Sequence, residues 1–353
     1  MPPLSRISGA PLWRTLGTMA LAAAGVVLFW SFGLPLPFLF GPMLACLVAA
    51  LLGAPLRGTG VIAVGARTIL GVAVGASITP AVIGQLPQMM ASVALMPIYI
   101  AVIGLVGVPY FTRVCGLDRV TAYYAAMPGG LQDMVVFGQE AGANIRSLSL
   151  IHATRILIIV TIAPIILTQG FGVPLTQPIG APAADMPLHE LGIMAIAALV
   201  GWKGGERIGL FGAPILGPMI LTAALSLAGV VHFRPPAEAI LFAQYFIGIG
   251  IGVGYVGVTL QELRRDVLSG IVYVMILAAL AAVFTEIVVF FGFAAPLEGF
   301  LSFAPGGQAE MTVLAIVAGA DLGFVVVHHL VRVLLVITGA PIMAKVLKLR
   351  APR

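Results

Sequence analysis

Charged residues are scarce in this chain. Only 9% of the 353 residues are Asp, Glu, Lys or Arg, whereas 60% are hydrophobic. Soluble domains carry a much larger charged fraction. This scarcity excludes a soluble globular protein and predicts a polytopic membrane protein. The Lys and Arg residues behind the net charge of +5 stand singly or in pairs at the ends of apolar runs, which indicates membrane topology rather than nucleic-acid binding.

Cysteine and histidine are also rare. The two cysteines, Cys46 and Cys115, form neither a CxxC motif nor another metal-binding spacing. Among the five histidines, only His328 and His329 are adjacent, and neighbouring side chains point in different directions on a helix. The sequence contains no P-loop, HExxH motif or Ser-His-Asp order. We therefore expect no catalytic residue, metal, cofactor or enzyme activity.

The main feature of the chain is an internal duplication. Residues 128–164 match residues 305–341 at an offset of 177, without a gap and with 14 identities in 37 positions. Shorter matches outside this segment extend the duplication over most of each half. The sequence therefore predicts two membrane repeats, 1–172 and 187–353, joined by a linker rich in proline and glycine.

Each repeat contains six apolar segments. In the first repeat they lie near 16–32, 36–53, 61–79, 91–112, 120–144 and 147–168. In the second they lie near 187–202, 209–231, 238–259, 267–293, 298–320 and 324–344. The first apolar run is long for a signal peptide and is needed as a span, so we expect it to be retained.

Positive charge distinguishes two topologies. If each Pro-Gly-Gly segment leaves the membrane on the side from which it entered, five segments cross per repeat. The second repeat is then inverted relative to the first. Fourteen of the 18 basic residues then lie inside, with Arg234 alone outside. If all six segments cross, ten basic residues lie inside and five outside. The positive-inside rule favours the first arrangement. The predicted fold is an all-α polytopic membrane protein with two inverted repeats, about ten transmembrane helices, two re-entrant or broken Pro-Gly-Gly segments, and cytoplasmic termini.

Each repeat places a carboxylate beside its Pro-Gly-Gly segment, Asp133 in the first and Glu310 in the second. Broken backbone at membrane depth is tolerated only where protein or a water-filled cavity receives its polar groups. The half-helix that follows the glycines would present its positive dipole end to an anion. Pro and Gly can also simply kink a span, but an ionisable residue in the membrane favours a functional site.

A His and an Arg lie three residues apart on one helical face in each repeat, as His152 with Arg155 and His329 with Arg332. One interpretation is that each acid pairs with an Arg to neutralise a buried charge. The other is that an acid titrates during transport while an Arg holds an anion and the histidines relay protons.

These patterns predict a secondary transporter of a small anionic organic solute, working by alternating access and coupled to protons or sodium. A channel or a sensor or regulatory membrane protein is the alternative, followed by a membrane oxidoreductase. The expected partners are the lipid bilayer, the solute and a coupling ion; nucleic acid is not expected, and a homodimer is left open. The predicted substrate-binding residues are Pro128, Gly129, Gly130, Gln132, Asp133, His152, Arg155, Pro305, Gly306, Gly307, Gln308, Glu310, His329 and Arg332, with Arg67 and Gln244 at equivalent positions of the two repeats.

Several of these segments carry a family resemblance: Gly-Pro-Met at 41 and at 217, and residues 127–134, 152–155, 304–311 and 329–332. In them the chain resembles the AbrB-type family of bacterial integral membrane proteins, a duplicated family unrelated to the DNA-binding regulators of the same name. Its members are often labelled ammonia monooxygenase or regulator. The resemblance covers nearly the whole chain and implies a multi-pass protein of the bacterial inner membrane, without implying a substrate.

Overall fold

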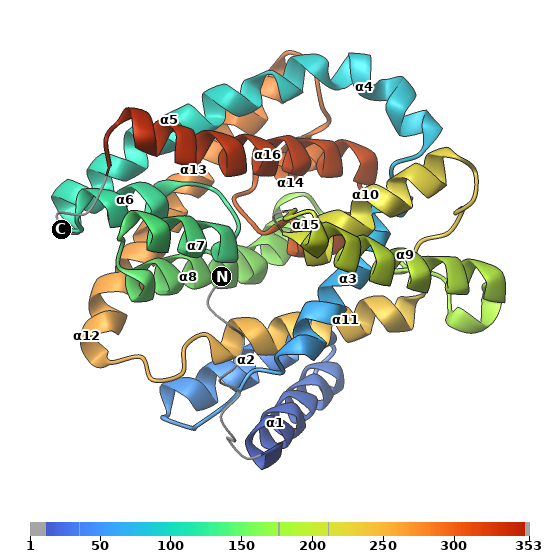
Figure 1. Ribbon diagram of the computed structural model, residues 1–353, viewed down its shortest axis with the longest axis horizontal. Coiled ribbons are helices and arrows are strands. Elements are labelled where there is room, and N and C mark those ends of the chain that lie inside the picture. Colours follow the sequence, from blue (N-terminus) through green and yellow to red (C-terminus); the bar gives the residue numbers. More distant parts are fainter. Residues whose placement is uncertain (1–11, 35, 176, 211, 350–353) are drawn as a thin grey trace. The chain divides into compact units, whose positions relative to one another are not determined.

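The computed structural model describes residues 12–34, 36–175, 177–210 and 212–349, with all side chains there except those of Leu12, Gln132 and Ala309. Helices joined by short loops make up these residues, and no strand occurs in the described ranges (Figure 1). A helix pairs its own backbone N–H and C=O groups, which apolar surroundings require. The prediction of an all-α protein is confirmed.

The described part of the first half of the chain contains eight α-helices. Short π-helical turns extend two of them, at Tyr110–Val114 and Ile166–Gly170. The helices are α1 (Leu12–Ser31), α2 (Pro37–Leu51), α3 (Val61–Ala76), α4 (Pro80–Val93), α5 (Leu95–Pro109), α6 (Arg119–Ala126), α7 (Leu131–Ala141) and α8 (Ile145–Ile165).

The second half repeats this order. A short 3₁₀ turn at Ala183–Asp185 precedes it, and a π-helical turn at Leu263–Val267 joins α12 to α13. The helices are α9 (Leu188–Arg207), α10 (Ala213–Leu227), α11 (Ala237–Val253), α12 (Leu260–Glu262), α13 (Leu268–Phe290), α14 (Pro296–Phe303), α15 (Gln308–Ala318) and α16 (Leu322–Val346).

Five stretches of described helix are long and apolar enough to cross a membrane: Trp13–Ser31, Pro80–Val114, Ile145–Gly170, Leu260–Phe290 and Leu322–Val346. Four further apolar helices, α2, α3, α10 and α11, are 15 to 17 residues long. At 1.5 Å per residue they extend about 22 to 26 Å, somewhat short of a hydrocarbon core of roughly 30 Å.

The long span predicted at 91–112 begins earlier, at Pro80. The Thr79 hydroxyl accepts the N–H of Val82, and Pro80 occupies the first turn, where its missing N–H costs nothing. The equivalent span of the second half begins at Leu260 rather than near 267, behind a capping box formed by Thr259 and Glu262. Treating prolines and charges as breaks placed both starts too late, because here they form helix caps and first turns.

The chain forms two compact units that cut across the sequence repeats. The smaller unit comprises Met1–Ala66 and Leu241–Val258, and so joins α1 and α2 of the first repeat to α11 of the second. In it the hydroxyl of Tyr245 on α11 donates to the carbonyl of Met19 on α1. The larger unit comprises Arg67–Ile240 and Thr259–Arg353 and contains all four half-helices beside the Pro-Gly-Gly segments.

Glycines allow close helix contacts in both units. In the larger unit, a Cβ on Gly71 of α3 would overlap the carbonyl oxygen of Ile215 on α10. In the smaller unit, a Cβ on Gly248 of α11 would overlap the carbonyl oxygen of Leu39 on α2. Both helix pairs therefore join one helix from each repeat through backbone contact.

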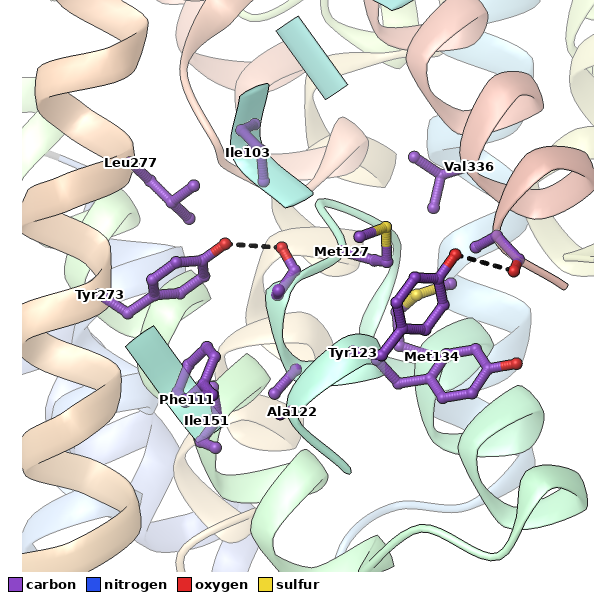
Figure 2. Close-up of a cluster of buried hydrophobic side chains, with 14 of the residues drawn as sticks. Ile103, Phe111, Ala122, Tyr123, Met127, Met134, Ile151, Tyr273, Leu277 and Val336 are labelled. Atoms are coloured by element: carbon purple, nitrogen blue, oxygen red, sulfur yellow. Dashed lines mark hydrogen bonds between the residues drawn. The ribbon is translucent and has the colours of Figure 1, made fainter. Parts of the chain in front are cut away.

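The larger unit is organised around a core of buried apolar and aromatic side chains. Phe111, Met127, Met134, Tyr273 and Val336 belong to this cluster, which gathers side chains around the turn that follows α6 (Figure 2). The core thereby fixes the position of the first Pro-Gly-Gly segment.

Candidate functional site

The first Pro-Gly-Gly segment folds back on itself as a hairpin of two short helices. The 8 residues of α6 and the 11 of α7 extend about 12 and 17 Å, too short to span a bilayer alone. The N–H of Asn144, just past α7, donates to Oγ1 of Thr121 in the first turn of α6 at 2.8 Å. The outer ends of the two helices therefore lie side by side, and the Pro-Gly-Gly turn forms the tip.

The second hairpin, α14 with α15, is closed by the equivalent hydrogen bond. The N–H of Asp321 donates to Oε1 of Glu298 at 3.2 Å. Asp321 and Glu298 follow Asn144 and Thr121 by 177 positions, which is the offset of the duplication. The tips hold two of the predicted residues, Pro128 and Pro305, which are both buried.

Breaking a helix leaves carbonyl groups without a helical partner, and His152 and Arg155 bind them in the first hairpin. Nε2–H of His152 donates to the carbonyl of Tyr124 at 3.0 Å; because a carbonyl only accepts, Nε2 carries the proton. The Arg155 guanidinium donates to the carbonyls of Met127, at 3.2 Å, and Gly129. Both side chains are buried.

The second hairpin repeats these contacts at the same offset. His329 donates from Nε2–H to the carbonyl of Leu301 at 2.9 Å. Arg332 donates to the carbonyls of Ala304, at 2.8 Å, and Gly306, at 2.7 Å. Each His-x-x-Arg pair thus holds the broken end of one hairpin in place.

These contacts bear on the interpretation that each acid pairs with an arginine. Among the described residues, neither Arg155 nor Arg332 forms an ion pair with a carboxylate. The expected neutralising pair of Asp133 with Arg155 is absent there, because backbone carbonyls occupy the guanidinium instead. A carbonyl partner has no sequence signature, so the sequence could not reveal it.

Two tyrosines donate hydrogen bonds to the remaining free carbonyls at the broken helix ends. The sequence analysis did not predict either of them. The hydroxyl of Tyr273 on α13 donates to the carbonyl of Ala126, the last residue of α6, at 2.7 Å (Figure 2). The hydroxyl of Tyr99 on α5 donates to the carbonyl of Phe303, the last residue of α14, also at 2.7 Å. Each tyrosine therefore caps the hairpin of the other repeat. A tyrosine within an apolar helix needs a partner for its hydroxyl, which is the signal that could have identified them.

Asp133 and Glu310 lie in the first turns of α7 and α15, three residues after the glycines that precede these helices. In both hairpins the carboxylate folds back over the glycine, so that a Cβ on Gly130 or Gly307 would overlap a carboxylate oxygen. Each carboxylate lies at the positive end of a helix dipole.

Arg67 connects the two carboxylates electrostatically. It is half-buried on α3, and its charge acts on both Glu310 and Asp133. The charge of Arg155 also acts on both carboxylates, and Arg155 and Arg332 act on each other. Together these three arginines and two carboxylates have an excess of one positive charge when all are ionised (three minus two).

The predicted glutamines lie on three different helices. Gln308 begins α15, and its Nε2 lies 3.8 Å from the sulfur of Met219 on α10. Gln244 lies on α11 in the smaller unit, buried, with no hydrogen-bond partner for its amide among the described residues. Gln132 lies on α7, and its side chain is outside the described part of the structure.

The histidines also show no metal site within the described ranges. His328 turns away from its neighbour and contacts Ser92 on α4, with 3.0 Å between Nε2 and the serine oxygen. No group of three His, Cys, Asp or Glu side chains gathers in the described part of the chain.

Long apolar helices and two broken-helix hairpins, whose buried polar contacts come from a duplicated segment, define a multi-pass helical membrane protein. The chain belongs to the AbrB family: the model of this family, described as "Transition state regulatory protein AbrB", matches residues 38–348. Two curated relatives match along almost their whole length. The "Uncharacterized protein YhjN" of Bacillus subtilis is 26% identical over 94% of this chain and 92% of its own. The "Putative regulator AbrB" of Escherichia coli is 22% identical over 97% of this chain and 98% of its own.

Proposed function

We propose that this protein is a secondary transporter of a small organic anion. The observation that carries the proposal is the matched pair of hairpins, each with a carboxylate in the first turn after its tip, and Arg67 acting on both carboxylates. Transporters commonly place broken helices and ionisable side chains at the substrate site. Hairpins used only for packing would not require a carboxylate at both tips.

The charge balance supports an anionic substrate. The group formed by Arg67, Arg155, Arg332, Asp133 and Glu310 has one positive charge in excess when ionised, and the dipoles of α7 and α15 add to it. Uncompensated charge in an apolar interior is costly. A bound monoanion would balance this charge, whereas a cation would increase it.

The structure changes the roles proposed for the predicted residues. His152, Arg155, His329 and Arg332 hold backbone carbonyls, so we assign them to positioning the hairpins. Asp133, Glu310 and Arg67 remain the candidates for contact with solute and coupling ion. Protons or sodium would act through the carboxylates, and the two repeats would provide alternating access.

For the membrane topology we propose that the first hairpin enters and leaves on the cytoplasmic side of the bacterial inner membrane, and the second on the periplasmic side. Five crossings per repeat then give inverted repeats and cytoplasmic termini, in agreement with the distribution of Lys and Arg. The hydrogen bonds that join the outer ends of each hairpin support this assignment.

Uptake into proteoliposomes tests the proposal. Radiolabelled acetate, lactate, succinate and citrate would be compared with the cation choline, with and without imposed proton and sodium gradients. We expect saturable, gradient-dependent uptake of at least one anion and none of choline. The variants Asp133→Asn and Glu310→Gln should lose most of this uptake.

The matched control is Glu140→Gln, which removes an exposed carboxylate from the same helix as Asp133. It should transport like the unmodified protein. Uptake by Asp133→Asn and Glu310→Gln equal to that of the unmodified protein would show that the carboxylates do not belong to the transport site. Single-channel currents without saturable uptake would show that the protein is a channel rather than a transporter.

A further inference from the structure

The helical turn at the start of the Leu260–Phe290 span is fixed in place by contacts with α8. Arg146 Nε lies 2.9 Å from Glu262 Oε1, and the Ser147 hydroxyl donates to Asp266 at 3.0 Å. The side chain of Thr259 caps the turn from the other end. The π-helical geometry at Leu263–Val267 exposes two consecutive arginines while the next two residues are buried. Such π-turns occur frequently at functional sites.

This turn has a basic side chain without an acidic partner. Glu262 pairs with Arg146, and Asp266 accepts the Ser147 hydroxyl and lies 3.5 Å from Arg265. Arg264 is exposed and forms no ion pair among the described residues. It lines a surface depression of about 630 Å³ together with Leu260, Gln261 and Arg265.

An exposed apolar stripe continues from Arg264 along α13. Leu268, Ile271, Val272 and Met275 are 54%, 40%, 43% and 57% exposed. Their spacing places them on one helical face, and Leu268 follows Arg264 by four residues. In a membrane protein such a face contacts lipid chains, so the basic depression is positioned where lipid headgroups lie.

We propose that this depression binds the phosphodiester headgroup of an anionic phospholipid. Arg264 and Arg265 would contact the phosphate, since guanidinium groups match phosphate oxygens in geometry and charge. The Gln261 amide would bond a headgroup hydroxyl, and one acyl chain would follow the stripe from Leu268 to Met275. This site is separate from the hairpins and does not depend on the transport proposal.

Comparison of the two repeats indicates that Arg264 and Arg265 are not needed for the fold that both repeats share. Thr79 caps α4 as Thr259 caps α12, which aligns the two helix starts. The corresponding first-half helix, Pro80–Val93, contains no basic residue. The arginine pair is therefore specific to one copy of a duplicated element.

Native mass spectrometry and thermal denaturation test the site on the full chain in neutral detergent. The probes are dioleoyl-phosphatidylglycerol, dioleoyl-phosphatidylcholine and inorganic phosphate at equal concentrations. We expect phosphatidylglycerol to be retained in preference to phosphatidylcholine and to raise Tm, and inorganic phosphate to do neither. Arg264→Gln should weaken phosphatidylglycerol binding roughly fivefold, whereas Arg264→Lys should retain most of it.

Arg113→Gln provides the matched control, because it removes one exposed positive charge from the end of another span. It should bind phosphatidylglycerol like the unmodified protein. Because Arg264 makes no ion pair with any described residue, its variants should keep the lipid-free Tm. Equal phosphatidylglycerol binding by Arg264→Gln and Arg113→Gln would overturn the proposal. A response to inorganic phosphate as strong as that to phosphatidylglycerol would instead identify a free-anion site.

Discussion

The two buried arginines of the hairpins bind backbone carbonyls rather than carboxylates. Arg155 and Arg332 each donate to two carbonyls in the turn after a short helix, and both are buried. The guanidinium fork supplies two parallel donors from one side chain, which a lysine ammonium cannot do in the same geometry. The matching geometry of the two hairpins thus depends on two buried guanidinium groups.

Removing either guanidinium should destabilise the protein. Arg155→Ala and Arg332→Ala each leave two buried carbonyls unpaired, at roughly 1 to 3 kcal/mol per group, so we expect a loss of about 2 to 6 kcal/mol. The measurement is thermal denaturation of purified protein in detergent. Arg146→Ala, which removes a partly exposed ion pair, is the control and should cost below about 1 kcal/mol. Similar Tm values for all three variants would contradict the structural role.

The variant that combines Asp133→Asn with Arg155→Ala tests the absence of an ion pair between these residues. Because Arg155 binds carbonyls, the two changes should add, with a coupling free energy below about 0.5 kcal/mol. The measurement is a double-mutant cycle on stability. Recovery of stability in the double variant would restore the neutralising pair that the sequence left open.

The residues that sequence reasoning could find are those marked by the duplication. Asp133 and Glu310, and the two His-x-x-Arg pairs, stand at matching places and were all predicted. Their partners could not be predicted, because a carbonyl acceptor exists at every position and only the fold determines which one is free. Tyr99 and Tyr273 were missed for a further reason: they are 174 residues apart, so they fall outside the constant offset of 177.

At the scale of elements, each hairpin is completed by a helix from the other repeat. The Tyr99 hydroxyl donates a hydrogen bond to the last carbonyl of α14, and the Tyr273 hydroxyl donates one to the last carbonyl of α6. Tyr99→Phe and Tyr273→Phe should each cost about 1 to 3 kcal/mol, since a buried carbonyl loses its donor. Thermal denaturation measures the effect. Tyr124→Phe is the control, because its buried side chain makes no hydroxyl hydrogen bond to a described residue. A loss of stability in this variant as large as in the other two would refute the assignment.

The glycines before α7 and α15 allow the carboxylates to fold back. Gly130→Ala or Gly307→Ala should displace the carboxylate, because the added Cβ would overlap it, and should lower transport more than stability. Uptake and Tm of the same preparations separate these effects. Gly84→Ala, at a helical glycine with open space around it, should leave uptake unchanged and should not lower Tm. Normal uptake by the hairpin variants would show that the folded-back position is dispensable.

On the whole molecule, cysteine labelling tests the proposed topology. In a Cys115→Ser background, where Cys46 is buried, Ala184→Cys and Ala295→Cys should react with a membrane-impermeant maleimide from the periplasm. Gly58→Cys and Glu140→Cys should react only after the membrane is opened. Glu140 is the informative position, because it lies in the last turn of α7, at the outer end of the first hairpin. Periplasmic labelling there would mean that the segment crosses the membrane.

The all-helical architecture could be predicted from composition and apolar periodicity, because both follow from the demand that backbone groups be paired without water. The division into compact units could not. The smaller unit combines α11 with α1 and α2, and the glycine contact between α11 and α2 bridges more than 200 residues of chain. Periodicity identifies which face of a helix is apolar but does not identify the helix that covers it.

The exchange of tyrosines between the repeats has a consequence for the ancestry of the fold. A chain that carried a single repeat would hold its own His-x-x-Arg pair, but the donor for the last carbonyl of its first short hairpin helix would have to arrive from elsewhere. A second copy of the same chain supplies that donor and receives one in return. A half-length ancestor with this design would therefore have been complete only as a pair, and joining two genes would have preserved in one chain an association that already existed between two.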